Sequence, residues 1–484
     1  MNKTYLWLIL IIILGCSLRF YQLDAESLWT DEMVSVIHAQ KSNVPAIVSS
    51  VTETELMPPG YFILLNKWIS IFGISEFSLR FIPALADTLS IMLIFLLGKK
   101  IFDYKVGLLS ASIYATVMLQ IVYAQEARPY ALFGLLSLLS SYLLILAYQC
   151  KHKEKLKYYF WAYLIVILFS LYVNYMAFFM IIIQGIFLFF WSRNNLMNYY
   201  LLSLAGALLG FLEGFKIMFI QAGIRHHYLQ ENLVLRGVPQ FFSNFGIFFY
   251  LLPLTILIVL LFSFLYFKRI SFQNKSLDQY YHLPRMTAIT LIILLFAMIM
   301  HIIFLDTTLR SFALIRHSFF IIPFFYLFIS KIILSLSNNW KKVIIILLLF
   351  CFNITLLTIY YTETTKAPWP EIISFLHEGS PPDTLLLFDR SGTNILLFDY
   401  YLSKLSLPEN NFRILKLTWE DKRQLKKINE SLLLEKLNTE NYFLVISSRN
   451  IKTGDYYIQL LNKKYQLIKS KEFKESRVYY YKVR

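Results

Sequence analysis

Long apolar runs dominate the first three quarters of the chain, and short polar stretches containing Lys or Arg separate them. A helix needs about 20 mostly apolar residues to cross the hydrocarbon core of a bilayer, with a range of about 17–25. Applied along the chain, this window predicts eleven membrane-spanning helices. They are expected at residues 4–21, 80–98, 107–123, 130–149, 158–173, 175–192, 198–216, 243–267, 286–305, 312–330 and 343–361.

The connection after the first span, about residues 21–79, is far too long for a turn. It contains two amphipathic pieces, Glu32–Ala39 and Tyr61–Phe72, of which the second is rich in Trp, Phe and Ile. Amphipathic helices of this kind suit the membrane interface. We therefore expect a large first loop with helices that lie at the interface.

The segment after the last apolar run has the composition of a soluble domain. Three runs in it are typical of strands, namely Thr384–Phe388, Tyr442–Ser447 and Val478–Val483, and two are typical of helices, namely Pro370–His377 and Asp421–Leu437. This alternation indicates a small α/β domain. The predicted fold class is an α-helical polytopic membrane protein, with a membrane domain at 1–361 and an extracytoplasmic α/β domain at 362–484.

Composition and charge support this organisation. The chain is 57% hydrophobic and only 16% charged, whereas a soluble domain is nearer a quarter charged. The net charge of +16 is spread in short basic clusters between apolar runs, which is the positive-inside pattern of membrane loops and argues against a nucleic-acid partner. It places the N-terminus in the cytoplasm and, with an odd number of spans, the C-terminal domain outside an inner (plasma) membrane.

Two further observations limit the class of protein. The first apolar run lacks an obvious small-residue cleavage site and more spans follow, so we expect a retained helix rather than a signal peptide. The chain contains no P-loop, no Gly-rich dinucleotide fingerprint and no His-Glu-x-x-His. This argues against a nucleotide-driven pump and a nucleotide-sugar-binding soluble domain.

Asp31 and Glu32 are two adjacent acids just after the first span. Charged groups close to lipid are costly and are kept there mainly for function. A structural interpretation is available, because acids after Ser27 or Thr30 suit the start of a helix. The functional interpretation is a carboxylate that acts as a general base at the membrane–water interface.

Two later groups of charges are expected at the same outer face. Arg128 follows Gln125 and Glu126 in a short turn between two apolar runs, where it either pairs with Glu126 or binds a phosphate. Arg310, Arg316 and His317 lie at the outer end of the tenth span, where they either reach toward lipid headgroups or bind a lipid phosphate.

The order and spacing of these motifs resemble those of GT-C glycosyltransferases that use polyprenyl-phosphate sugars, notably the family 39 protein mannosyltransferases and the lipid A aminoarabinose transferases. The resemblance runs from Leu28 to about Tyr326 and continues weakly into the tail. It is carried by Trp29-Thr30-Asp31-Glu32, Pro58-Pro59, Phe77-Ser78-Leu79-Arg80, Gln125-Glu126-Ala127-Arg128-Pro129-Tyr130-Ala131-Leu132, and Arg316-His317 with Pro323.

The resemblance implies a first outer loop over a cavity in the membrane, with Asp31 as the catalytic base and Glu32 as its neighbour and alternative. The family often has His or Lys just before the Pro-Pro pair, where this chain has Met57.

On the basis of this resemblance, our hypothesis is that Arg128 and Arg316 hold the phosphate of an undecaprenyl-type donor while the sugar is transferred with inversion. The supporting residues are Glu126, Tyr61, Tyr130, Arg310 and His317. No metal-ligand set is expected, and the need for a divalent cation stays open. The acceptor, which is a lipid, a glycan or a protein, is not fixed.

Two alternatives remain. A glycolipid transporter or flippase also has many spans and cavity-facing charges, but transporters usually show internal repeats and broken helices near the midplane. A lipid-linked polymer ligase would differ only in the donor.

Overall fold

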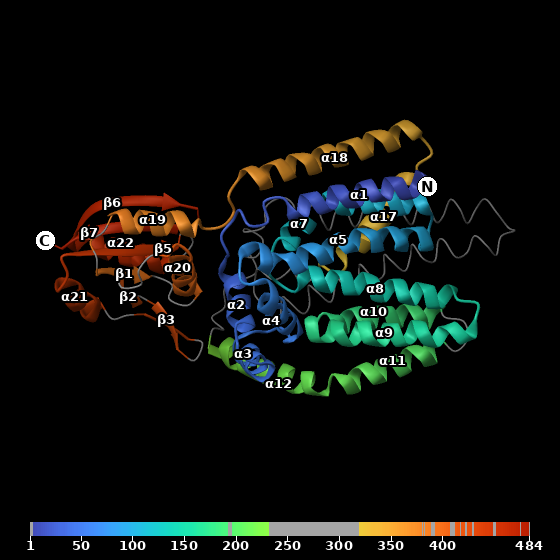
Figure 1. The fold of residues 1–484 in the computed structure, drawn as a ribbon, viewed down its shortest axis with the longest axis horizontal. Helices are drawn as coiled ribbons and strands as arrows, with labels where there is room; N and C mark the ends of the chain where they lie inside the picture. The colour runs from blue at the N-terminus through green and yellow to red at the C-terminus, as the bar shows by residue number, and fades with distance from the viewer. Residues whose placement is uncertain are drawn as a thin grey trace. The chain divides into compact units, whose positions relative to one another are not determined.

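The computed structural model describes residues 3–191, 196–231 and 319–483, apart from 380, 382, 389–392, 407–411, 417, 422–423, 428–429, 449–451 and 475. Among the described residues, five helices are long and apolar enough to cross a membrane. They are α1 (Lys3–Phe20), α5 (Glu76–Ile101), α8 (Tyr130–Gln149), α9 (Lys153–Val173) and α18 (Asn339–Thr362). Figure 1 shows α1, α5, α8 and α9 running lengthwise beside one another.

Two of the predicted spans are bent helix pairs rather than straight helices. In one pair α6 (Tyr104–Thr116) meets α7 (Met118–Ala124) at 60°, and in the other α11 (Leu196–Gly210) meets α12 (Leu212–Glu231) at 63°. Counting each pair as one span gives up to seven spans in the described part of the chain. Shorter apolar helices are α4 (Gly60–Phe72), α10 (Ala177–Trp191) and α17 (Ile322–Ser335).

The predicted spans at 243–267 and 286–305, and the first part of the span at 312–330, lie outside the described residues. The count of eleven is therefore not confirmed. The long first loop contains α2 (Thr30–Ala39) and α3 (Val44–Thr54) in addition to α4. The two amphipathic pieces predicted in the loop correspond to α2 and α4.

By compactness the chain divides into two units that are discontinuous in sequence. The membrane unit comprises Met1–Tyr21, Pro45–Leu64 and Arg80–Leu357, and the loop–tail unit comprises Gln22–Val44, Leu65–Leu79 and Thr358–Arg484. Each unit thus combines part of the first loop with later segments. The tail folds together with loop residues, which the division predicted at residue 361 does not include.

A buried ion pair joins three helices of the membrane unit. Arg19 of α1 donates from Nε to Asp87 Oδ2 of α5 at 2.6 Å, and both side chains are fully buried. The remaining nitrogens of Arg19 donate to the carbonyls of Gly15, Ala115 and Tyr114 at 3.0–3.1 Å. The hydroxyl of Tyr114 donates to the second oxygen of Asp87 at 2.5 Å. Because every charge has partners, the network holds α1, α5 and α6 in one register.

Glycines bring α5 and α6 into backbone contact. A Cβ added at Gly98 would lie 2.7 Å from the Cα of Gly107, and one added at Gly107 would lie 2.6 Å from the carbonyl oxygen of Phe95. Small residues at helix interfaces allow this close approach in membrane proteins.

The loop–tail unit is built on a five-stranded sheet with the strand order β2-β1-β5-β7-β6. Its strands are β1 (Thr384–Phe388), β2 (Phe412–Lys416), β5 (Tyr442–Ser448), β6 (Gln466–Phe473) and β7 (Ser476–Lys482). β1 runs parallel to β2 and β5, whereas β7 is antiparallel to β5 and β6. The helices are α19 (Trp369–Gly379), α20 (Thr393–Lys404), α21 (Glu430–Asn438) and α22 (Lys452–Lys464).

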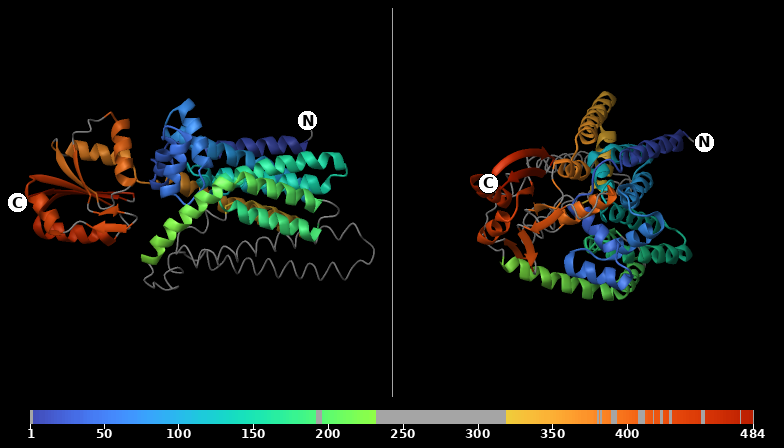
Figure 2. Two further views of the ribbon diagram at one scale, coloured as in Figure 1. Left: turned by 90° about the horizontal axis from the view of Figure 1, so that it is seen from below. Right: turned by 60° about the vertical axis from the view of Figure 1, so that its left-hand side comes forward.

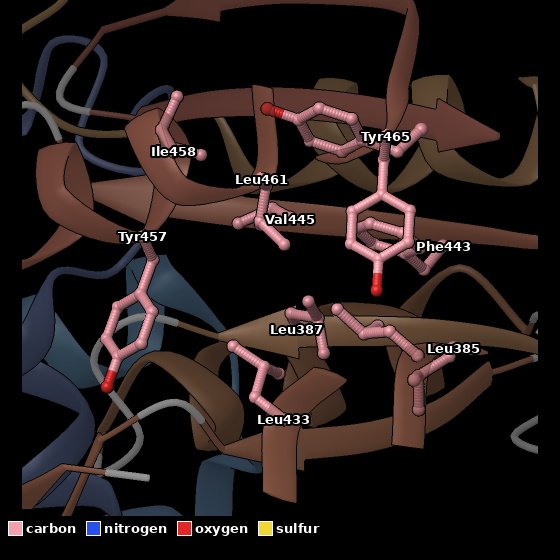
Figure 3. Close-up of a cluster of buried hydrophobic side chains, with 11 residues drawn as sticks. Leu385, Leu387, Leu433, Phe443, Val445, Tyr457, Ile458, Leu461 and Tyr465 are labelled. Carbon is pink, nitrogen blue, oxygen red and sulfur yellow. The ribbon is translucent and has the colours of Figure 1, made fainter. Parts of the chain in front are cut away.

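Helices cover both faces of this sheet (Figure 2). On one face, alternate residues of β1 such as Leu385 and Leu387 pack with Leu433 of α21 and Leu461 of α22 (Figure 3). On the other face, Phe388 meets the ring of Phe398 from α20 at 5.6 Å. Central strands buried on both sides explain why β1 and β5 read as continuous apolar runs.

The strands predicted in the tail are present as β1, β5 and β7, with β1 at the predicted bounds. The helix predicted over Asp421–Leu437 is wrong in its first half, because β3 (Thr418–Asp421) and β4 (Gln424–Lys427) form an antiparallel hairpin there. Between Asp421 and Lys427 only Leu425 is apolar, so this segment has no apolar stripe to bury as a helix. α21 begins at Glu430.

We expect Asp87→Asn to destabilise the protein strongly, because Arg19 would keep its charge in a buried site without a counter-charge. Removing one partner of a buried pair costs about 3–5 kcal/mol. Thermal unfolding in detergent measures this. The matched control is Glu213→Gln, which breaks the exposed Lys216–Glu213 pair and should change little. Equal midpoints for the two variants would contradict a stabilising role for the buried network.

Candidate active site

The acid pair lies at the start of α2. Trp29 is the N-cap residue, and its backbone N–H donates to Glu32 Oε2 at 3.2 Å, as in a capping box. Asp31 lies in the same first turn, and its backbone carbonyl accepts from the Ser35 hydroxyl at 3.3 Å. The pair thus lies in the first turn of a helix, as the structural interpretation predicted, although the N-cap residue is Trp29 rather than Ser27 or Thr30.

The two acids occupy different environments. Glu32 is fully buried, and its Oε2 lies 3.0 Å from the ammonium of Lys366, which is 15% exposed. Asp31 is partly exposed. The carboxylate of Glu32 therefore serves the helix N-terminus and an ion pair with the tail, whereas Asp31 is the more exposed residue of the two.

The residues just before Asp31 are bound to the tail within the loop–tail unit. Glu26 accepts from both the backbone N–H and the hydroxyl of Thr365, the latter at 2.8 Å. The Ser27 hydroxyl accepts from the Trp369 backbone N–H at 3.2 Å. Together with the Glu32–Lys366 pair, these bonds fix both the approach to α2 and its first turn.

Tyr401 of α20 makes the most buried of these connections. Its hydroxyl accepts from the Leu28 N–H at 2.7 Å and donates to Glu76 Oε1 at 2.8 Å. Glu76 also pairs with Lys404. Burial raises the pKa of the Tyr401 hydroxyl well above its ordinary value, and the nearby Glu76 carboxylate raises it further. The hydroxyl therefore keeps the proton that it donates to Glu76.

Arg128 lies in the turn between α7 and α8 and forms a largely buried ion pair with Glu55. The two guanidinium Nη atoms lie 2.9 and 3.4 Å from the two carboxylate oxygens, and the side chains are 4% and 13% exposed. Nη2 also lies 3.7 Å from the sulfur of Met57. Glu55 and Met57 come from the loop between α3 and α4.

Hydrogen bonds fix the turn that carries Arg128. Gln125 Nε2 donates to the carbonyls of Arg19 at 3.0 Å and Tyr21 at 2.9 Å. It thereby satisfies carbonyls at the end of α1, which have no partner within the helix. Within the membrane unit, the chain segment that opens the first loop and the turn that carries Arg128 are thus joined directly.

The other predicted residues are placed as follows. The backbone carbonyl of Glu126 accepts from the Arg128 N–H at 2.7 Å, and its side chain is partly exposed. Tyr130 is buried and meets Tyr123 edge to face, with ring centroids 5.6 Å apart. Tyr61 is buried in α4. Arg310, Arg316 and His317 lie outside the described residues.

The sequence analysis missed three residues, of which two pair with predicted site residues and the third binds Leu28, in the segment before Asp31, and Glu76. They are Glu55, the partner of Arg128; Lys366, the partner of Glu32; and Tyr401. Glu55 is an acid three positions before Pro58-Pro59, and this position is a local signal that could have identified it. Lys366 and Tyr401 are more than 300 positions from their partners, and no local pattern signals the contact.

In the described part of the chain, no group of three His, Cys, Asp or Glu side chains could hold a metal ion.

The sequence model of the family described as dolichyl-phosphate-mannose-protein mannosyltransferase matches residues 57–214. That segment contains Arg128 and Tyr61. No curated protein sequence matches the chain.

Solved structures resemble the chain over nearly its whole length. The crystal structure of ArnT from Cupriavidus metallidurans bound to undecaprenyl phosphate is 12% identical, with a TM-score of 0.59 and 98% coverage of both chains. The apo state of the same protein gives 12% identity, a TM-score of 0.55, and coverage of 99% of this chain and 98% of ArnT.

A third similar structure is the archaeal oligosaccharyltransferase AglB from Archaeoglobus fulgidus, in complex with an inhibitory peptide and a dolichol-phosphate. It is 14% identical, with a TM-score of 0.53, over 99% of this chain and 74% of AglB. At these identities the likeness concerns the fold. With the apolar helices and the family match, it confirms a multi-pass membrane protein and the resemblance to GT-C glycosyltransferases that the motifs predicted.

Proposed function

We propose that this protein is a membrane glycosyltransferase that moves a sugar from a polyprenyl-phosphate-linked donor to a lipid, glycan or protein acceptor at the outer face. The likeness to ArnT bound to undecaprenyl phosphate, over 98% of both chains, carries the proposal. The match of residues 57–214 to a family of dolichyl-phosphate-mannose users supports it.

In this proposal Arg128 and Arg316 bind the donor phosphate. A guanidinium presents several N–H donors in a planar fork that fits two phosphate oxygens. It also stays charged while negative charge accumulates on the leaving phosphate. The bidentate geometry that Arg128 adopts toward Glu55 supports the assignment, because the same fork can hold a phosphate.

Asp31 is the proposed general base. It takes the proton from the acceptor hydroxyl or amine as that group bonds to the anomeric carbon. The bond from this carbon to the phosphate oxygen breaks, and the polyprenyl phosphate leaves with the electron pair. Attack from the opposite side inverts the anomeric centre. The partial exposure of Asp31 supports this role, whereas Glu32 is buried beside Lys366 and holds the turn in place.

Asp31→Asn should lower sugar transfer by about 10²–10⁴-fold, the usual effect of losing a general base, while thermal stability stays near that of the parent. Transfer is measured in membranes with a radiolabelled polyprenyl-phosphate sugar. Glu32→Gln is the matched variant. It should lower the unfolding temperature, because Lys366 loses its counter-charge, with a smaller loss of transfer per folded molecule. A larger loss of transfer in Glu32→Gln than in Asp31→Asn would reverse the two roles.

Arg128→Lys keeps the positive charge and removes the fork. We expect undecaprenyl phosphate to bind about 10-fold or more weakly, because a bidentate charged contact becomes a single one. Equilibrium binding to the purified protein measures this effect. Arg413→Lys, which alters an exposed ion pair in the tail, is the control and should bind like the parent. Unchanged binding by Arg128→Lys would remove Arg128 from the donor site.

A glycolipid transporter is the second candidate, because bent helix pairs such as α6–α7 and α11–α12 are a feature of transporters. Reconstituted vesicles separate the two functions. Sugar transfer without movement of the lipid between leaflets favours the transferase, and movement without transfer favours the transporter.

A further inference from the structure

The Glu55–Arg128 pair presents a problem for the proposed donor site. The guanidinium assigned to the phosphate already holds a carboxylate in bidentate geometry, with 4% and 13% of the two side chains exposed. A second anion at the same fork would repel the first, and the repulsion is strong where water is scarce. A phosphate therefore has to replace Glu55 rather than join it.

The loop that carries Glu55 is held on both sides. Gln221 of α12 donates from Nε2 to the carbonyls of Val51 at 3.3 Å and Met57 at 3.1 Å, which flank Glu55 in the sequence. The Tyr175 hydroxyl donates to Gln221 Oε1 at 2.7 Å and so orients the amide.

At the start of α4 the backbone itself is in contact with α9. A Cβ added at Gly60 would lie 2.6 Å from the carbonyl oxygen of Tyr172. The turn that carries Arg128 is held separately, by the hydrogen bonds of Gln125 to the end of α1. Since both backbones are fixed, release of the ion pair requires only side-chain rotation, and the carboxylate stays within reach of the guanidinium.

We propose that Glu55 is a stand-in for the donor phosphate: it holds the fork of Arg128 when no lipid phosphate is bound and takes it back as the product polyprenyl phosphate leaves. This inference rests on the proposed function, since it requires Arg128 to bind phosphate. It makes Glu55 a positioning residue that sets how tightly the lipid phosphate is held and how fast the enzyme turns over.

The test compares binding of undecaprenyl phosphate, without sugar, to the full-length protein in nanodiscs. Glu55→Gln keeps the size and an acceptor oxygen but removes the competing charge. We expect the dissociation constant of this variant for undecaprenyl phosphate to fall about tenfold. Only in the parent does the phosphate have to break the charged hydrogen bonds between Glu55 and Arg128. Glu53→Gln, an exposed neighbour bonded to Ser49, is the control and should match the parent.

Kinetics give a second measure. In Glu55→Gln the rate of a single turnover should stay close to that of the parent, while kcat falls and inhibition by undecaprenyl phosphate strengthens, because product leaves more slowly. A residue that merely stabilises the fold would lower both rates together.

Equal or weaker binding of undecaprenyl phosphate by folded Glu55→Gln overturns the proposal. If Glu55→Gln fails to fold, Glu55→Asp is the second variant. Its shorter side chain holds Arg128 less well, so we expect it to bind undecaprenyl phosphate about two- to fivefold more tightly than the parent.

Arg128→Ala distinguishes this inference from the proposed function. If it weakens binding of undecaprenyl phosphate and abolishes the effect of Glu55→Gln in the double variant, both proposals stand. If it weakens binding while Glu55→Gln has no effect in either background, only the role of Glu55 fails. If Arg128→Ala binds the lipid like the parent, the donor site itself is wrong.

Discussion

The buried pair of Arg19 and Asp87 is the interaction on which the membrane unit depends. Apolar helices gain little from meeting one another in lipid, because the acyl chains are as apolar as the side chains. A charged pair with every hydrogen bond made is directional, and it fixes α1, α5 and α6 in one register. Gln125 then binds the end of α1, beside Arg19 itself. The position of the Arg128 turn therefore follows from a contact inside the helix bundle.

A second polar network does the same for the loop–tail unit. Glu26, Glu32 and Glu76 of the loop segments each accept hydrogen bonds from tail residues, and two of these acids are almost completely buried. Buried carboxylates are costly unless they are paired. The tail thus supplies the counter-charges and donors that stabilise these acids of the loop segments. This gives the α/β domain a definite structural task, which is to hold these loop segments in place.

Much of the fold follows from local pattern, and little of the site does. The apolar run at 130–149 matches α8, and β1 lies at its predicted bounds. Both were predictable because each element is an uninterrupted run of mostly apolar residues. The bends at Val117 and Phe211 could not be predicted, because both residues are apolar and leave the apolar runs uninterrupted. The difference between Asp31 and Glu32 was also hidden, because the partner of Glu32 is 334 positions away. Pairings at that distance are decided by the folded chain and leave no periodic trace.

The interleaving of loop and tail has a consequence for how such proteins change. A tail that merely followed the membrane helices could be exchanged between relatives as one cassette. Here Lys366, Tyr401 and Lys404 match acids encoded far upstream. A foreign tail would therefore arrive without the partners that those acids need. Recombination or engineering that is to keep the protein folded has to transfer the three stretches of the loop–tail unit together, namely Gln22–Val44, Leu65–Leu79 and Thr358–Arg484.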